Sequence, residues 1–316
     1  MQAVILAAGR GKRLHPITAT RTKAMAPIAG KPIVERVMDT LVANGIAEFI
    51  LVTSPDDLEI ADHFHNRSGF SGSITLVTQP EPLGMGHALI QAIPYIHEDF
   101  VLSACDSLAP AEEISNLLNV WEQEKPNAIL TTLEVGPEKI TRMGIVEMDG
   151  IWINRIIEKP ALEEAPSNIG SLPLYVFSRT ILDYLREIQP SSRGEYELQD
   201  AIQLLIERNG SVRGFQFTRR VDLTTPQDLL SLNLEYLNNG IPESQIQPES
   251  KGVNTHLIHP VHLEEGVSIG SNCVIGPNVY VEMGCQIGDE VQLENAIVLR
   301  GRSIPDQSVI RGQVIW

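Results

Sequence analysis

Cysteine is scarce in this chain of 316 residues, which contains only Cys105, Cys273 and Cys285. Three cysteines this far apart cannot build a disulfide framework, and none forms the C-x-x-C pair typical of zinc or redox sites. We expect them to be buried, reduced thiols.

Long apolar runs are missing as well. The first run, Ala3 to Ala8, is short and precedes Arg10, Lys12 and Arg13, which is the reverse of the order in a secretory signal. No other run approaches the roughly 18 apolar residues of a membrane span. These absences favour a cytoplasmic protein without membrane association.

Positive charge is in short supply: 24 Lys and Arg face 40 Asp and Glu, for a net charge of −16. Such a surface repels the phosphate backbone of nucleic acid, so we expect no nucleic-acid partner. The 43% of hydrophobic and 20% of charged residues are ordinary for a globular protein. At about 150 residues per domain, the length predicts two domains.

The first two thirds of the chain alternate short apolar runs with amphipathic stretches, which is the pattern of an α/β domain with a mostly parallel sheet. A helix is predicted from Ile33 to the stop signal Asn44-Gly45. Further helices are expected at 198–208 and 227–238. Strands are expected at 3–7, 49–53, 74–78, 100–103, 128–135, 144–148, 151–157, 174–177 and 212–217. We assign residues 1–239 to this domain.

A linker is predicted at 240–252, and a different pattern fills 253–316. Aliphatic residues recur every six positions from Leu257 to Leu299, with Gly and Asn between them. A hexapeptide repeat predicts a parallel β-helix with one short strand per hexad. Resemblance to hexapeptide-repeat proteins implies the left-handed form with three hexads per coil, hence about three coils. Tyr280 and Val298 are expected on its outer faces.

The strongest local motif is the glycine loop from Leu6 to Leu14, which follows the first predicted strand. Six of the 24 basic residues lie in the first 31 positions, before the first acidic residue at Glu35. Glycines let backbone N–H groups approach phosphate oxygens. The loop lacks the G-K-[ST] ending of a P-loop, and Leu14 occupies the third glycine position of a dinucleotide motif. On so acidic a protein, this loop indicates a local anion site.

With its surroundings, this loop resembles the sugar-phosphate nucleotidylyltransferases, which join a nucleoside triphosphate to a sugar 1-phosphate. The resemblance spans residues 1 to about 240, and a hexapeptide tail occurs in several branches of that family. The matching positions are Leu6 to Leu14, Pro16, Thr18, Lys23, Met25, Pro27, Ile28, Lys31, Pro32, Gln79, Leu83-Gly84, Gly86-His87-Ala88, Asp106, Gly144, Glu158-Lys159-Pro160, Gly194-Glu195-Tyr196, Asp200, Val221-Asp222 and Thr225-Pro226.

The resemblance implies a Rossmann-like nucleotidyltransferase domain in which Asp106 and Asp222 hold Mg²⁺. Two carboxylates and phosphate oxygens form the oxygen shell that this hard cation prefers. Arg13 and Lys23 are implied to neutralise the triphosphate, which makes Arg13, Lys23 and Asp106 the expected catalytic residues. The remaining nucleotide contacts are expected from the loop residues Ala8, Gly9 and Gly11.

The same resemblance assigns base recognition to Gln79 and Gly84. A side-chain amide and a backbone amide can satisfy the imide edge of uracil or thymine, so UTP or dTTP is the expected nucleotide. The sugar phosphate is expected at Gly144, Glu158 and Lys159, with Lys159 on the phosphate and Glu158 on a sugar hydroxyl.

Several positions depart from the family pattern. Lys12 replaces a usual Thr or Ser, Met85 a usual Thr, and Cys105 and Thr224 usual Gly residues. Pro173 replaces a Gly whose N–H the resemblance assigns to the sugar pocket. These changes leave open a second interpretation, in which the protein is a catalytically weakened relative that binds nucleotide or serves regulation.

A third interpretation is a hexapeptide acyltransferase. About three coils are few for that chemistry, however, and no carboxylate partner for a catalytic histidine is evident.

The tail is expected to serve assembly or regulation. About three coils leave open ends that something must cover, so we expect a homo-oligomer. His256, His259 and His262 invite a metal site, but His256 and His262 are one hexad apart and belong to different faces of the coil. Exposed edge residues are the favoured interpretation.

Overall fold

The computed structural model describes residues 1–219, 221, 223–239 and 250–316. The chain forms two compact units, and the glycine loop is divided between them. The first unit comprises residues 1–9 and 34–222, and the second comprises 10–33 and 223–316.

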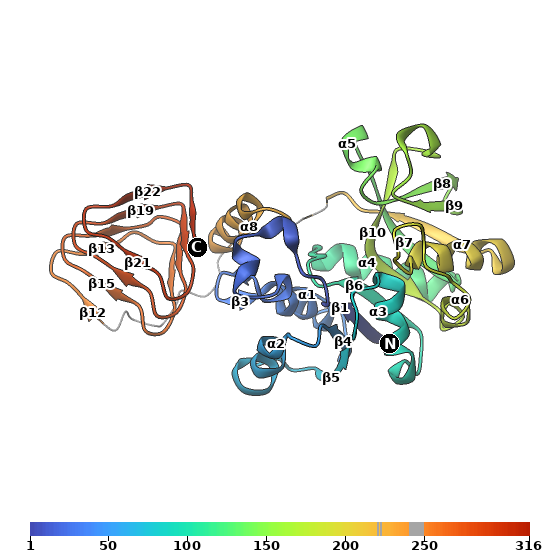
Figure 1. The fold of residues 1–316 in the computed structure, drawn as a ribbon, viewed down its shortest axis with the longest axis horizontal. Coiled ribbons are helices and arrows are strands. Elements are labelled where there is room, and N and C mark those ends of the chain that lie inside the picture. The colour runs from blue at the N-terminus through green and yellow to red at the C-terminus, as the bar shows by residue number, and fades with distance from the viewer. Residues whose placement is uncertain (220, 222, 240–249) are drawn as a thin grey trace. The chain divides into compact units, whose positions relative to one another are not determined.

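The first unit contains a nine-stranded sheet in the order β5-β4-β1-β6-β10-β7-β11-β9-β8 (Figure 1). Its strands are β1 (Gln2–Leu6), β4 (Glu48–Thr53), β5 (Ser73–Thr78), β6 (Phe100–Ala104), β7 (Ala128–Glu134), β8 (Gly144–Asp149), β9 (Trp152–Glu158), β10 (Ile169–Phe177) and β11 (Val212–Gln216). All nine predicted strands are confirmed, with ends that differ by a few residues.

Four adjacent strands, β5, β4, β1 and β6, run parallel. Strand β10 is antiparallel to both β6 and β7, and β9 is antiparallel to β11 and β8. Every residue of β1 is buried, so both faces of the sheet are covered at its centre. The sheet is mixed in its pairings, but seven of its nine strands run in one direction, as predicted, and only β9 and β10 run against them. The parallel strands place their carboxyl ends along one edge.

Helices α3, α6 and α7 pack against one another and against the sheet. Their core includes Leu89, Leu185 and Leu205 with strand residues such as Phe100 and Tyr175. The helices are α1 (Ile33–Val42), α2 (Leu58–Asp62), α3 (Met85–Ala92), α4 (Ala111–Glu124), α5 (Pro137–Ile140), α6 (Ile181–Leu185), α7 (Leu198–Asn209) and α8 (Pro226–Asn238). Short 3₁₀ turns are η5 (Ile93–Tyr95) and η6 (Leu162–Glu164), and η4 (His63–Arg67) is a π-helical turn.

The second unit contains the β-helix, drawn in orange and red in Figure 1. Three parallel sheets, each of four strands, form its three faces, which is the arrangement expected of a hexapeptide β-helix. They are β12-β15-β18-β21 (Ser250–Lys251, Ser268–Ile269, Gln286–Ile287, Ser303–Ile304), β13-β16-β19-β22 (His256–Leu257, Val274–Ile275, Gln292–Glu294, Val309–Arg311) and β14-β17-β20-β23 (Val261–Leu263, Val279–Val281, Ala296–Val298, Val314–Ile315).

The β-helix thus has four coils rather than about three. One reason is that β12 lies inside the predicted linker, of which 240–249 are outside the described residues. The other is that the strict repeat ends after Leu293. Val281 pairs with Val298 and Ile287 with Ile304, a spacing of 17 residues where the first coils have 18.

This shorter coil corrects the expected orientation of two residues. Val298 belongs to the β-helix core, because the loss of one residue at the corner near Asn295 shifts the register. Tyr280 is fully buried although it faces outward, because helix α8 packs against β17 and β20 on that face. The tail therefore packs against the last helix of the expected first domain.

The segment 10–33 also belongs to the second unit. It consists of three 3₁₀ turns and a small antiparallel pair of strands: η1 (Lys12–Leu14), η2 (Ile17–Ala19), η3 (Lys23–Met25), β2 (Pro27–Ile28) and β3 (Lys31–Pro32). Most of the glycine loop and its basic residues thus lie in the same compact unit as the tail.

Candidate functional site

In the first unit, expected site residues follow three of the four adjacent parallel strands β5, β4, β1 and β6. Ala8 and Gly9 follow β1, Gln79 follows β5, and Asp106 follows β6. Backbone hydrogen bonds join the chain just after these strands to the neighbouring strands: the Gln79 N–H donates to the Thr53 carbonyl, and the Cys105 N–H donates to the Leu6 carbonyl. Ligands of open α/β sheets bind outside the carboxyl ends of the strands, so this edge is the candidate nucleotide side of the unit.

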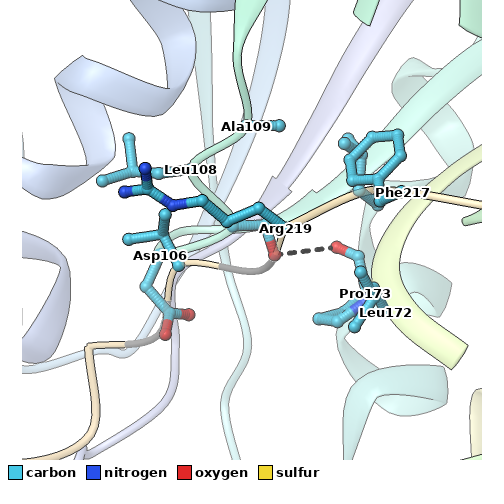
Figure 2. Close-up of a pocket in the computed structure, with 10 residues that line it drawn as sticks. Asp106, Leu108, Ala109, Leu172, Pro173, Phe217 and Arg219 are labelled. Atoms are coloured by element: carbon cyan, nitrogen blue, oxygen red, sulfur yellow. Dashed lines mark hydrogen bonds between the residues drawn. The ribbon is translucent and has the colours of Figure 1, made fainter. Parts of the chain in front are cut away.

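Asp106 lines a pocket in the turn that follows β6, together with Pro173, Phe217 and Arg219 (Figure 2). Sequence reasoning did not identify Arg219, whose only signal was its position three residues before Asp222. Its guanidinium is a charged group in a pocket otherwise lined mainly by apolar side chains. The pocket therefore combines a carboxylate, which can bind a cation, with a guanidinium, which suits a phosphate group.

Pro173 occupies a bulge in β10, where its pairing with β7 shifts between Ser171 and Tyr175. The missing N–H therefore interrupts no ladder hydrogen bond with β7. Its carbonyl accepts a hydrogen bond of 3.2 Å from the Ser107 hydroxyl, the dashed line in Figure 2. Pro173 thus lies in the wall of the Asp106 pocket.

Asp222, the second expected metal ligand, lies outside the described residues. Its neighbour Val221 forms an isolated antiparallel bridge with Leu108, two residues after Asp106. No group of three or more His, Cys, Asp or Glu side chains suited to a metal occurs within 1–219, 221, 223–239 and 250–316.

Gln79 is buried, and its amide nitrogen donates to the Gly84 carbonyl at 3.0 Å. The same nitrogen lies 3.1 Å from Nδ1 of His87. The amide oxygen of Gln79 and the N–H of Gly84 have no hydrogen-bond partner among the described residues. The loop therefore presents one acceptor and one donor.

The backbone of Gly84, the N-cap residue of helix α3, has a φ of 97°, which L-residues rarely adopt. A Cβ on Gly84 would lie 2.9 Å from the carbonyl oxygen of Tyr196. Tyr196 donates its N–H to Leu83 and accepts from the Gly86 N–H, and its ring stacks on His87. The matched Gly194-Glu195-Tyr196 motif therefore buttresses the Gln79–Gly84 loop.

Glu158 ends strand β9 opposite Gly144, the first residue of β8. Its side chain is only 7% exposed and lies 3.1 Å from the Lys159 ammonium, which is also 3.9 Å from Glu195. Burial raises the pKa of the Glu158 carboxyl, and Lys159 opposes this only in part. The three expected sugar-phosphate residues thus come together at one β-hairpin.

Gln199 on α7 is a further candidate that the sequence did not reveal. A Cβ on Gly144 would lie 3.2 Å from Oε2 of Glu158 and 3.3 Å from Cγ of Gln199. Both Oε2 of Glu158 and Oε1 of Gln199 are buried acceptors without a hydrogen-bond partner in the described chain. Buried acceptors generally have a donor partner, and the hydroxyl groups of a sugar are donors that suit both.

In the second unit, Gly11 adopts a left-handed conformation with φ of 59° and is the N-cap residue of η1, which contains Lys12 and Arg13. A Cβ on Gly11 would lie 2.8 Å from the Cβ of Lys23, and the Thr18 hydroxyl donates to the Gly11 carbonyl at 3.1 Å. Arg13 is exposed and Lys23 is half-buried. These residues therefore form one packed loop.

The histidines of the tail differ from one another. His256 and His259 are exposed, and His256 and His262 belong to different faces, as predicted. His262 is not an exposed edge residue, because its ring lies against Gly30 and is tilted over Tyr280 at 5.6 Å. Segment 10–33 covers this histidine.

Two family models match the chain: "Nucleotidyl transferase" over residues 2–239 and "GMPPB C-terminal domain" over 257–316. The bifunctional protein GlmU of Methanococcus maripaludis strain S2 is 32% identical over all of this chain and 77% of its own length. The UTP–glucose-1-phosphate uridylyltransferase AglF of Haloferax volcanii is 34% identical over 72% of this chain and 93% of its own.

Among solved structures, a UDP-glucose pyrophosphorylase complexed with UDP-glucose superposes with a TM-score of 0.68 over 76% of this chain and all of its own. At 23% identity, this likeness supports the fold alone. The first-domain match covers the strands, the Asp106 turn and the Gln79–Gly84 loop described above. The chain belongs to the nucleotidyl transferase family.

Proposed function

We propose that this protein transfers a nucleotidyl group from UTP or dTTP to a sugar 1-phosphate, producing a nucleotide sugar and pyrophosphate. The observation that carries this proposal is the acceptor–donor pair of the Gln79 amide oxygen and the Gly84 N–H at the carboxyl edge of the parallel strands. The imide edge of uracil and thymine presents an acceptor, a donor and an acceptor in that order, and its N–H and C=O groups complement this pair. Purine bases present donors and acceptors in a different order.

The triphosphate requires positive charge, which Arg13 and Lys23 would supply from segment 10–33. Charge accumulates on the α-phosphoryl group and on the departing pyrophosphate, and catalysis of such transfers consists largely of neutralising it. Backbone N–H groups near Ala8, Gly9 and Gly11 would add donors.

The metal ligands in this proposal are Asp106 and Asp222, because two carboxylates supply the oxygen donors that Mg²⁺ prefers. Asp106 lines a pocket beside the carboxyl edge, and Leu108, two residues later, forms a bridge with Val221. When bound there, Mg²⁺ would neutralise phosphate oxygens during transfer.

The sugar 1-phosphate would bind at the hairpin of β8 and β9. The Lys159 ammonium would hold its phosphate, while Glu158 and Gln199 would accept hydrogen bonds from sugar hydroxyls through their unpartnered oxygens. Gly144 leaves room for these two side chains, since any Cβ there would crowd both.

The reaction is a single in-line displacement. A phosphate oxygen of the sugar phosphate forms a bond to the α-phosphorus, and the bond from that phosphorus to the oxygen bridging to the β-phosphate breaks. Pyrophosphate leaves with that electron pair. No covalent nucleophile is needed, because the protein's work is positioning and charge neutralisation.

A location in the cytoplasm is part of this proposal. Within the described residues, no helix combines the length and the apolar character that crossing a membrane requires.

The test is a panel of UTP, dTTP, ATP, GTP and CTP, each combined with several hexose 1-phosphates, with pyrophosphate release as the readout. We expect turnover with UTP or dTTP and at least one sugar phosphate. Tight nucleotide binding without turnover on any sugar phosphate would support the weakened relative instead, and preference for a purine nucleotide would remove the role of Gln79 and Gly84.

A further inference from the structure

A buried ion pair joins segment 10–33 to the β-helix within the second unit. Nη1 of Arg21 donates to Oε1 of Glu282 at 2.6 Å, and Nη2 donates to Oε2 at 2.9 Å, across 261 residues of sequence. The two side chains are 2% and 8% exposed. A two-bond fork between guanidinium and carboxylate fixes orientation as well as distance.

The same carboxylate also organises the neighbouring coil. Oε2 of Glu282 accepts the backbone N–H of Arg300 at 2.8 Å, and the guanidinium of Arg300 donates to the Thr20 carbonyl at 2.9 Å. Two consecutive residues of the loop, Thr20 and Arg21, are therefore held by two coils of the β-helix. We call Thr20, Arg21, Glu282 and Arg300 the loop clamp.

A second carboxylate nearby has other partners. Oε1 of Glu264 accepts the Tyr280 hydroxyl at 2.5 Å, and Oε2 accepts the Met283 N–H at 3.0 Å. Glu282 is thus the carboxylate that binds Arg21 directly.

The loop clamp lies close to the cations proposed for the triphosphate. Lys23 follows Arg21 by two residues, and its Cβ packs against Gly11, the N-cap residue of η1, which lies two residues before Arg13. Thr18, on the other side of Arg21, donates to the Gly11 carbonyl. A shift of Arg21 would therefore move both flanks of the loop that carries Arg13 and Lys23.

The far end of the segment is anchored separately. The Asn233 amide on α8 donates to the Pro27 carbonyl at 3.0 Å and accepts the Ala29 N–H at 2.7 Å. Gly30 packs against the His262 ring. Because residues 27–30 have their own anchors, loss of the loop clamp should loosen residues near 11–25 rather than release the whole segment.

We propose that the β-helix positions the phosphate-binding loop, and that Glu282 is a positioning residue for nucleotidyl transfer. The tail then has a part in substrate binding as well as any part in assembly. This inference rests on the proposed function, because it assigns the tail's effect to the triphosphate half of the reaction.

Glu282→Gln tests the proposal in the full chain. The substitution keeps the size of the side chain but removes the charge, so Arg21 loses its buried counterion. We expect kcat/KM for UTP, or for dTTP if the panel prefers it, to fall by about tenfold or more, with KM for the sugar 1-phosphate changed less than twofold. A general loss of structure would not separate the two substrates.

Glu294→Gln is the matched control, because it breaks the exposed pair of Glu294 and Arg311 on the same β-helix. We expect wild-type kinetics from it. Arg21→Lys provides a second test that keeps the positive charge but cannot form the fork, and it replaces Glu282→Gln if that variant does not fold. Arg21→Lys should also lower kcat/KM for the nucleoside triphosphate, with KM for the sugar 1-phosphate nearly unchanged.

Hydrogen exchange gives a readout that does not depend on turnover. Amides of residues 12–25 should exchange faster in Glu282→Gln than in Glu294→Gln, with those of 27–33 unchanged. Unchanged exchange in 12–25, or equal losses for both substrates, would overturn the positioning role. Absence of turnover in the wild-type panel would instead reject the proposed function, while the exchange comparison would still decide whether the loop clamp holds the loop.

Discussion

Two carboxylates of the first unit have different surroundings: Asp106 lies in the turn after β6, and Glu158 is the last residue of β9. Asp106 is half-buried in a turn that lines a pocket. Glu158 is nearly enclosed, with one oxygen near Lys159 and the other without a partner in the described chain. Their proposed roles, metal ligand and sugar acceptor, follow from this difference.

Asp106→Asn should lower kcat by at least about a thousandfold, because an amide is a weaker ligand for Mg²⁺ and removes a negative charge. The rate of pyrophosphate release measures kcat, and circular dichroism verifies that the variant is folded. Asp149→Asn, which changes an exposed carboxylate at the end of β8, should be neutral. Full activity in Asp106→Asn would remove this residue from the site.

Glu158 also predicts a pH dependence of stability. Because burial raises its pKa in the folded state above the usual 4.5, its contribution to stability is fully present below pH 4.5 and is lost as pH rises through the raised pKa. The side-chain amide in the variant Glu158→Gln does not titrate, so the variant does not lose stability in this way. The free energy of unfolding of the variant minus that of the wild type should therefore increase as pH rises from 4.5 through the raised pKa.

Urea unfolding at a series of pH values measures this difference. Glu147→Gln, at an exposed position on the neighbouring strand β8, is the control and should show no such trend. A constant difference between Glu158→Gln and wild type from pH 4 upward would contradict the raised pKa.

At the scale of elements, the Gln79–Gly84 loop depends on a glycine without space for a side chain. Gly84→Ala adds a Cβ 2.9 Å from the Tyr196 carbonyl at a positive φ, so the loop must shift. We expect KM for the nucleoside triphosphate to rise about tenfold, with about 1 kcal/mol or more lost in stability.

Gly150→Ala separates crowding from backbone strain. Gly150 also has a positive φ, 58°, but nothing lies within 4 Å of a Cβ there. It should lose stability without any change in KM. Equal kinetics in the two alanine variants would show that the Gly84 loop does not bind the nucleotide.

Elements that depend on local interactions could be predicted from the sequence, and features that depend on distant segments could not. The strands and the hexads up to Leu293 were predictable because side-chain periodicity reports burial locally. The 17-residue coil was not, since a corner at Asn295 leaves a plausible six-residue pattern running on to Leu299. The burial of Tyr280 depends on α8, about forty residues earlier, and no local pattern encodes it.

The candidate site shows the same limit. Motif resemblance identified Gln79, Gly84, Glu158 and Lys159, and the fold brings each pair together within the first unit. Their supports were invisible in the sequence, because Gln199 and Tyr196 act through contacts between distant segments. The pairing of Arg21 with Glu282 spans most of the chain and required the folded structure.

At the scale of the whole molecule, the open ends of the β-helix predict self-association. Val253 and Ile258 in the first coil and Val309 and Trp316 in the last are large apolar residues exposed by 45 to 72%. Apolar residues exposed on the terminal coils favour contact with another copy. We expect a homo-oligomer by light scattering.

Val309→Asp should shift the molecule towards monomer if the last coil forms the contact, and Val253→Asp should do so if the first coil does. Ile151→Asp, at a comparably exposed position in the first unit, is the control and should leave the mass unchanged. A wild-type mass equal to one chain at all concentrations would reject self-association.

The most direct test of the central claim, nucleotidyl transfer by one displacement, is the stereochemistry at the α-phosphorus. The full chain would be incubated with Mg²⁺, the preferred sugar 1-phosphate and an α-thio nucleoside triphosphate of known configuration. The account predicts a nucleotide sugar with inverted configuration and an equal amount of pyrophosphate. Retained configuration, or pyrophosphate without a nucleotide sugar, would contradict it.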